Sequence, residues 1–109
     1  MAIQHAISGQ AVNVRPLGNT LAQQQNTAIF KSTRLEVIRL VLPQGKTMRE
    51  HKVAGDITVH CLEGRIDFLS GADHQVLAAG ELVYLAGGVV HSLIALEDAS
   101  ALLTIALCP

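Results

Sequence analysis

Aromatic residues are scarce in this chain. Its 109 residues include two Phe, one Tyr and no Trp. A hydrophobic core must therefore be built mainly from Val, Leu, Ile and Ala, within a composition that is 50% hydrophobic. A chain of this length has the size of one compact domain, and this supply of apolar residues suffices for a single core. We expect one domain over residues 1–109.

A basic cluster is also missing. The formal net charge is -1, whereas nucleic acids and anionic membranes need a concentrated basic surface to displace their counterions. We therefore expect neither partner. All eight Lys and Arg lie at or before Arg65, and the charged residues that follow are carboxylates. A closed sheet would interleave the two halves of the chain, so this unevenness predicts a surface of mixed sign.

The chain has neither a long hydrophobic run nor a cysteine framework. No uninterrupted apolar stretch approaches the length that spans a bilayer, and residues 1–8 lack the basic start and apolar stretch of an export signal. Cys61 and Cys108 form no recognisable disulfide or metal spacing. Free thiols are typical of a reducing compartment. We expect a cytoplasmic protein that does not enter a membrane.

The apolar residues occur in short runs separated by turn signals at intervals of about 8–12 residues, the pattern of an all-β sandwich or barrel. Apolar parity switches between Val37 and Ile38, which predicts a bulge or a stretch buried on both faces. One helical turn is expected around residues 21–25, and residues 1–26 as a whole are expected to form an N-terminal strand and loop. The predicted strands are residues 11–14, 27–31, 34–42, 56–62, 65–69, 75–78, 82–86, 90–96 and 100–107.

Two segments of the chain carry a pattern of glycines and histidines. In the first, Gly45 and Gly64 enclose His51. This segment resembles the first motif of the cupin superfamily, which runs Gly, five residues, His, one, His, three or four, Glu, six, Gly. The chain keeps the spacing, but Val53 stands at the place of the second His and Ile57 at the place of the Glu.

The second segment resembles the second cupin motif, which runs Gly, five residues, Pro, one, Gly, two, His, three, Asn. Gly80, Gly88 and His91 keep this spacing, while Ala86 replaces the Pro and Ala95 the Asn. The chain is thus similar to small single-domain cupins with degenerate metal-binding motifs.

The resemblance covers residues 43–96 and implies the fold. We expect an all-β, antiparallel double-stranded β-helix, the jelly-roll barrel of cupins. Small cupins commonly pair through exposed sheets and N-terminal strands, so the resemblance also implies a homodimer. It does not rank substrates, because one barrel hosts many chemistries.

In the family, three His and one Glu converge on a divalent metal. Val53 and Ile57 place hydrocarbon at two of these positions, so His51 and His91 are the remaining candidate metal ligands. Two imidazoles leave most of a coordination sphere for Fe, Mn, Ni or Zn to water, substrate or another protein ligand. Asp56 is the candidate for this further protein ligand. In an unbroken strand its side chain would face outward, so a bulge would be needed to turn it inward.

Side chains alternate faces along a strand, so residues 51, 53, 57, 59 and 61 can point into the barrel if no bulge intervenes, as can 91, 93 and 95 from a neighbouring strand. His60 has the opposite parity and should face away from the interior. In the alternative to a metal site, the two histidines are a polar pair, bonded to each other or to water. They would sit in an apolar cavity lined by Val53, Ile57, Val59, Cys61, Leu93 and Ala95.

Two further residues are candidates for ligand contacts. Arg49 lies two residues before His51 and so on the same strand face, where its guanidinium could receive a carboxylate or phosphate, unless it is simply solvated. Tyr84 is the sole tyrosine and could act as a donor or acid, or serve in packing.

Three functions stay open. The first is a module that binds a small, largely apolar molecule, with polar contacts from Arg49, His51, Tyr84 and His91. The second is a metal-dependent enzyme, an oxygenase or isomerase, in which Asp56 or water completes the two-histidine site. The third is a purely structural or interaction role.

Overall fold

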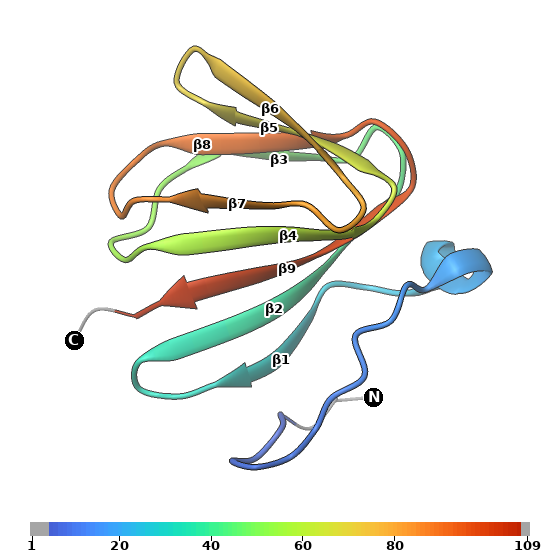
Figure 1. Ribbon diagram of the computed structural model, residues 1–109, viewed down its shortest axis with the longest axis vertical. Coiled ribbons are helices and arrows are strands. Elements are labelled where there is room, and N and C mark those ends of the chain that lie inside the picture. The colour runs from blue at the N-terminus through green and yellow to red at the C-terminus, as the bar shows by residue number, and fades with distance from the viewer. Residues whose placement is uncertain (1–4, 108–109) are drawn as a thin grey trace.

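The computed structural model describes residues 5–107 and consists mainly of two antiparallel β-sheets that face each other (Figure 1). A short 3-10 helix precedes the strands. The elements are η1 (Gly18–Gln23), β1 (Thr27–Lys31), β2 (Leu35–Leu42), β3 (Thr47–His51), β4 (Ile57–Glu63), β5 (Arg65–Ser70), β6 (Asp73–Ala78), β7 (Leu82–Leu85), β8 (His91–Ala95) and β9 (Ala99–Ala106).

The strand order is that of a jelly roll. One sheet has five strands in the order β1-β2-β9-β4-β7, and the other has four in the order β3-β8-β5-β6. Strands far apart in the chain are neighbours: β9 lies between β2 and β4, and β8 lies between β3 and β5. The all-β antiparallel barrel predicted from the sequence is confirmed.

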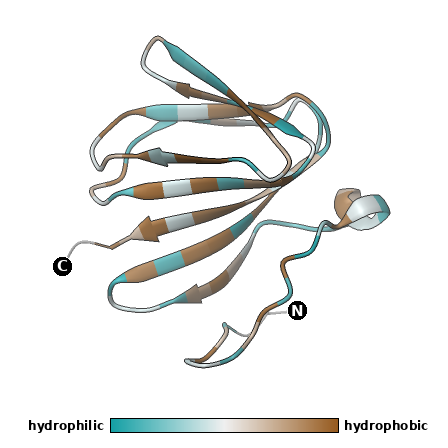
Figure 2. Ribbon diagram, viewed as in Figure 1, coloured by the Kyte–Doolittle hydropathy of each residue, from teal (hydrophilic) through white to brown (hydrophobic). Residues whose placement is uncertain are grey.

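Alternation along the strands sorts residues between the core and the outer surface. In β4, Ile57, Val59 and Cys61 are buried, while Thr58 and His60 are only half-buried. Figure 2 shows the corresponding hydrophobic and hydrophilic bands along this strand. The prediction that His60 faces away from the interior is therefore confirmed.

The core is mostly aliphatic, as the scarcity of aromatic residues predicts, and Phe68 of β5 is its aromatic member. Both sheets contribute to it, because each turns one apolar face inward. The buried cluster consists of Leu40, Leu42, Ile57, Val59, Cys61, Ile66, Phe68, Leu77, Leu93, Ala95, Ala99, Ala101 and Leu103.

Three local predictions are wrong or shifted. Residues 11–14 were expected as a strand but have no regular structure, and Val12 is exposed there. The helical turn expected at residues 21–25 is η1, which begins earlier, at Gly18. Strand β3 has no predicted range, although Arg49 and His51 were expected on one strand. Its residues are mostly polar, and its pairing with β8 makes it a strand. Across residues 5–107, no helix has the length and apolar character needed to cross a membrane.

The bulge predicted at Val37 and Ile38 lies on the partner strand. Ala28 of β1 pairs with Ile38 and Phe30 with Val37, so Ile29 is the extra residue. Strand β2 itself pairs without interruption along β9. The parity switch has a second cause, since the end of β2 is buried on both faces through Leu40, Val41 and Leu42.

Two glycines with left-handed backbone offer a matched test of the packing. Gly64 has φ of 75°, and a Cβ there would lie 2.1 Å from the carbonyl oxygen of Asp98. Gly45 has φ of 85°, with no atom within 4 Å of the same position. Gly45→Ala should therefore lower the free energy of unfolding by about 1–2 kcal/mol through backbone strain alone. Gly64→Ala should lower it by roughly a further 1–3 kcal/mol through the added clash.

Urea denaturation of both variants and the wild type measures this difference. An equal decrease in the free energy of unfolding of the two variants would contradict the close approach of the Asp98 backbone to Gly64.

Candidate functional site

The two motif histidines lie directly opposite each other on neighbouring strands. His51 ends β3, His91 begins β8, and the two residues are register partners in the antiparallel pair. Their ring centroids are 4.2 Å apart, with an angle of 57° between the ring planes. The expectation that these histidines meet from adjacent strands is confirmed.

Each imidazole is oriented by the backbone carbonyl two residues before it. Nδ1 of His51 lies 2.9 Å from the backbone oxygen of Arg49, and Nδ1 of His91 lies 3.0 Å from that of Val89. A carbonyl oxygen only accepts, so each Nδ1 must donate its proton. In the neutral imidazole, Nε2 then keeps its lone pair. The sequence predicts bonds between the two rings or to water, and at Nδ1 the partners are instead backbone oxygens.

Phe68 completes the group and was missed by the sequence reasoning. Its ring stacks on His91, with centroids 5.7 Å apart and 23° between the planes. Both residues are buried, whereas His51 is half-buried and is therefore the more accessible member of the pair. The available signal was the alternation in β5, where Ile66 and Phe68 share the inward face.

The chain between the two predicted ligand positions does not form one strand. Strand β3 ends at His51 in the four-stranded sheet, and β4 begins at Ile57 in the five-stranded sheet. The crossing between the sheets is tightly packed, since a Cβ at Gly55 would lie 1.7 Å from the carbonyl oxygen of Ala106. The assumption of continuous alternation from residue 51 to residue 61 is therefore wrong, although Ile57, Val59 and Cys61 still face the interior.

The other two ligand positions of the cupin metal motif hold the hydrocarbon side chains of Val53 and Ile57. Val53 is half-buried against the core, and Ile57 is buried within it. Asp56 is exposed, and its Oδ1 accepts a hydrogen bond of 2.9 Å from the backbone N–H of Gly87. No group of three or more His, Cys, Asp or Glu that could hold a metal is found in the part of the chain that the structure describes. The residues present thus fit two of the four family positions, and Asp56 does not take the place of a third.

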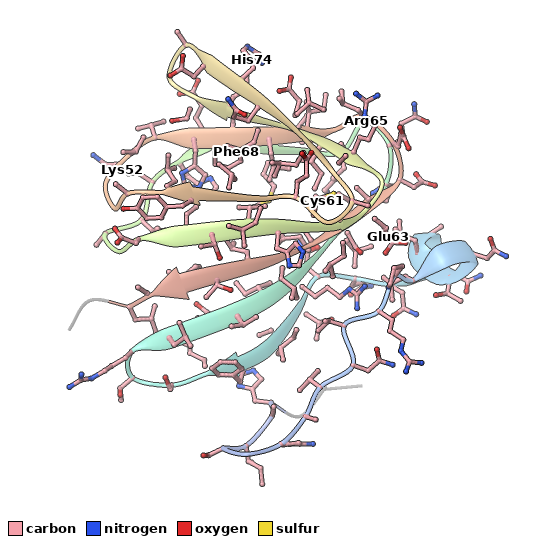
Figure 3. The ribbon with its side chains drawn as sticks, in the orientation of Figure 1. Lys52, Cys61, Glu63, Arg65, Phe68 and His74 are labelled. Carbon is pink, nitrogen blue, oxygen red and sulfur yellow. The ribbon has the colours of Figure 1, made fainter. Side chains whose placement is uncertain are left out.

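The predicted apolar lining residues pack into the core. Cys61 and Leu93 are buried there, and Figure 3 places Cys61 toward the end of the barrel opposite Lys52, the neighbour of His51. Burial raises the pKa of the Cys61 thiol, which therefore stays protonated and unreactive. Its Sγ donates to the backbone oxygen of Glu63 at 3.3 Å.

Arg49 and Tyr84 do not join the histidine pair. The register of β3 shifts between Met48, which packs on the core, and His51, so the alternation that placed Arg49 on the face of His51 is broken. The side chain of Arg49 is exposed. Tyr84 pairs with Thr58 on the outer face of the five-stranded sheet and is 60% exposed, so it lies outside the barrel.

A depression adjoins His91, one of the two motif histidines. Its volume is about 280 Å³, and it opens beside His91 at the end of the four-stranded sheet. It is lined by Glu50, Leu69, Gly71, Val90, His91 and Ser92. This depression and four others found among the described residues are lined by residues other than Val59, Cys61 and Leu93. The depression reaches His91 at the barrel end, and His51 is not among its lining residues.

Comparison with known proteins identifies the fold. No protein-family model and no curated protein matches the sequence. Among solved structures, a conserved protein of unknown function from Streptococcus pyogenes aligns over 100% of this chain and 96% of its own, with a TM-score of 0.77 and 19% identity.

Two cupins align comparably. An RmlC-like cupin from Desulfovibrio desulfuricans covers 89% of this chain and 96% of its own at 18% identity, and a cupin superfamily protein from Desulfitobacterium hafniense covers 89% and 94% at 14% identity. Both have a TM-score of 0.75. The chain therefore has the cupin fold, the double-stranded β-helix that the sequence motifs implied.

The orientation of the two rings can be tested directly. Nitrogen NMR spectra recorded at alkaline pH, where imidazole is neutral, should show Nδ1 protonated in both His51 and His91, because each donates to a backbone carbonyl. His60, on the outer face of β4, serves as the reference ring. A proton on Nε2 of either motif histidine would contradict the arrangement.

Proposed function

We propose that this protein binds a small, largely apolar molecule at the end of the barrel, with His51 and His91 as its polar anchor. The two rings lie side by side, and each is held by its own backbone so that Nε2 is free to accept a hydrogen bond. A ligand that carries a hydroxyl or amide N–H would satisfy these acceptors. The stacked ring of Phe68 supplies an apolar surface next to them.

The observation that carries this proposal is the fixed orientation of both imidazoles. A histidine pair kept only for packing needs no common tautomer, whereas two acceptors aligned on adjacent strands form a preorganised polar site. Pockets for small molecules typically combine apolar walls with a few polar groups of this kind. The depression beside His91 is a route of entry.

A metal-dependent oxygenase or isomerase is the second candidate. Metal-binding histidines generally donate their other ring nitrogen to a carbonyl or carboxylate, and both motif histidines do so through Nδ1. Fe, Mn, Ni or Zn would then have two protein ligands, with the rest from water or substrate. This candidate ranks second because Val53 and Ile57 are hydrocarbon and Asp56 is bound to Gly87.

Binding can be tested with phenol and anisole, two probes of similar shape of which only phenol donates a hydrogen bond. Phenol at millimolar concentration should shift the NMR signals of His51, His91 and Phe68, and anisole should shift them much less. The double variant His51→Ala/His91→Ala should lose the phenol response. The control variant His60→Ala/His74→Ala should keep it, because both of its histidines lie outside the pair.

Equal shifts with both probes, or an unchanged response in the first double variant, would contradict the proposal. The metal content of the purified protein distinguishes the metal-dependent enzyme from the metal-free binding module. If protein purified without a polyhistidine tag holds near-stoichiometric metal, and the His51→Ala/His91→Ala variant loses it while the control variant does not, the metal-dependent candidate replaces the metal-free one.

A homodimer is also proposed, with a second copy of this chain covering the outer face of the five-stranded sheet at β7. That strand lies at the edge of the sheet, and its outward residues Leu82 and Tyr84 are 56% and 60% exposed. Apolar side chains on a free strand edge favour pairing with another chain.

Light scattering after size exclusion tests the dimer. The wild type should elute with the mass of two chains, and Leu82→Arg should reduce it to one. Val76→Arg, at a comparably exposed position on β6 of the other sheet, should leave the mass unchanged. A monomeric wild type would exclude the proposal.

A further inference from the structure

A second polar cluster lies far from the histidines and involves the N-terminal arm, defined here as residues 15–26. Figure 3 shows Glu63 between the end of the sheets and helix η1, which is part of this arm. The three side chains of the cluster are Arg39 of β2, Glu63 of β4 and Ser100 of β9. Arg39 and Ser100 lie outside both cupin motifs, and Glu63 lies within the first one but at none of its specified positions.

A bulge in β4 turns Glu63 toward the outer face of the five-stranded sheet. Cys61 pairs with Ala101, but Glu63 pairs with Ser100, so the register shifts by one residue between them. Ala101 and Cys61 are in the core, whereas Ser100 has the opposite parity in β9. Bulges characteristically redirect a side chain in this way. Without the bulge, the alternation would direct this carboxylate into the core.

The carboxylate of Glu63 binds the arm through two backbone amides. Oε2 accepts from the N–H of Leu17 at 2.8 Å, and Oε1 accepts from the N–H of Gly18 at 3.0 Å. Leu17 is the N-cap residue of η1 and makes no side-chain cap bond of its own. Glu63 therefore caps this helix from a residue distant in sequence, and satisfies donors that would otherwise lack a partner.

The same carboxylate is neutralised from the sheet side. The hydroxyl of Ser100, which is fully buried, donates to Oε2. Nη2 of Arg39 lies 3.7 Å from Oε2 and also donates to the backbone oxygen of Arg15 at 2.5 Å. The Arg39 and Glu63 side chains are only 11% and 15% exposed, so removal of one charge leaves the other poorly solvated.

The arm covers part of the outer face of the five-stranded sheet. Asn26 accepts a hydrogen bond of 2.7 Å at Oδ1 from the N–H of Val41, and Leu21 of η1 is buried. Val41 and Ser100 are both on the outer face of the sheet, yet both are buried. An apolar groove of about 640 Å³ continues along the same face under residues 6–14, between that segment and Val37 and Leu102.

We propose that Glu63 is a latch that holds the N-terminal arm closed over the outer face of the five-stranded sheet. When its carboxylate is neutralised, the arm opens as a unit and exposes Val41 and Ser100, while the barrel stays folded. The barrel does not need the latch, because the core cluster contains none of its three side chains. The arm does need it, because Glu63 caps the helix of the arm and also pairs with Arg39, which holds the backbone oxygen of Arg15.

The charge environment sets the direction of the pH response. Burial alone would raise the pKa of Glu63, but hydrogen bonds from Leu17, Ser100 and Gly18 and the charge of Arg39 outweigh it and hold the pKa below its usual range. The other titratable group beside it is the Cys61 thiol, which donates to the Glu63 carbonyl from the same strand.

A carboxyl whose pKa is lowered in the folded state stabilises that state above its unfolded pKa. This stabilisation is lost as the pH falls through the folded value. The latch is therefore closed at neutral pH and opens in acid, below the usual range for glutamate.

Hydrogen exchange measured by mass spectrometry tests the latch with Glu63→Gln. The oxygen of the Gln side chain can still accept a hydrogen bond from one backbone N–H of the arm. Its NH₂ group would face the other N–H, which is also a donor. Exchange in residues 17–26 should be at least about tenfold faster than in the wild type, with β4 and β9 unchanged. Glu81→Gln is the matched control, since Glu81 also accepts a backbone N–H, that of Ala78, through Oε1 at 2.7 Å. It should leave the arm unchanged.

Two results would overturn the latch: exchange in the arm that does not change, or exchange that rises equally throughout the barrel, which would make Glu63 a determinant of the whole fold. If Glu63→Gln fails to fold, the wild type is measured from about pH 7 to about pH 3, with exchange corrected for its intrinsic pH dependence. The arm should then open before the strands do, and simultaneous opening would count against the latch.

Discussion

The pairing of strand β9 with both β2 and β4 is the interaction on which this structure depends. All eight residues of β2 find partners on β9, and the other edge of β9 aligns with β4. The chain must therefore bring its last strand between two earlier ones before the five-stranded sheet exists. This insertion also sets the environment of Glu63, because Ser100 of β9 is its register partner.

The two polar clusters of the molecule follow from departures from regular pairing. A shift in β3 beyond Met48 brings His51 opposite His91, and a shift in β4 beyond Cys61 turns Glu63 onto the outer face. Each bulge interrupts the alternation of side chains and presents a polar residue where strict alternation would not. The apolar core between the two clusters is left intact. The fold thus separates a candidate ligand site at one end from an attachment point for the N-terminal arm.

Strand positions and the histidine pair could be predicted because they rest on local signals. Alternating apolar residues and glycine turns mark most strands, and the spacing of the motifs indicated His51 and His91. Prediction failed where pairing with a neighbouring strand decides whether a segment forms a strand or which way a side chain faces. Strand β3 carries little apolar signal, Arg49 lies within a bulge, and Tyr84 has an outward parity that only its pairing with Thr58 reveals. Phe68 was missed because its contact with His91 crosses from β5 to β8.

The class of fold and the hydrocarbon at two ligand positions of the cupin motif can be inferred from the sequence, because glycine spacing, apolar alternation and residue identity are properties of the chain. Which side chains meet depends on the tertiary structure. The tautomers of the two histidines, the outward hydrogen bond of Asp56 to Gly87 and the cluster of Arg39, Glu63 and Ser100 all join residues through strand register. Register is set by pairing between distant segments, and one shifted residue reverses the face to which a side chain points.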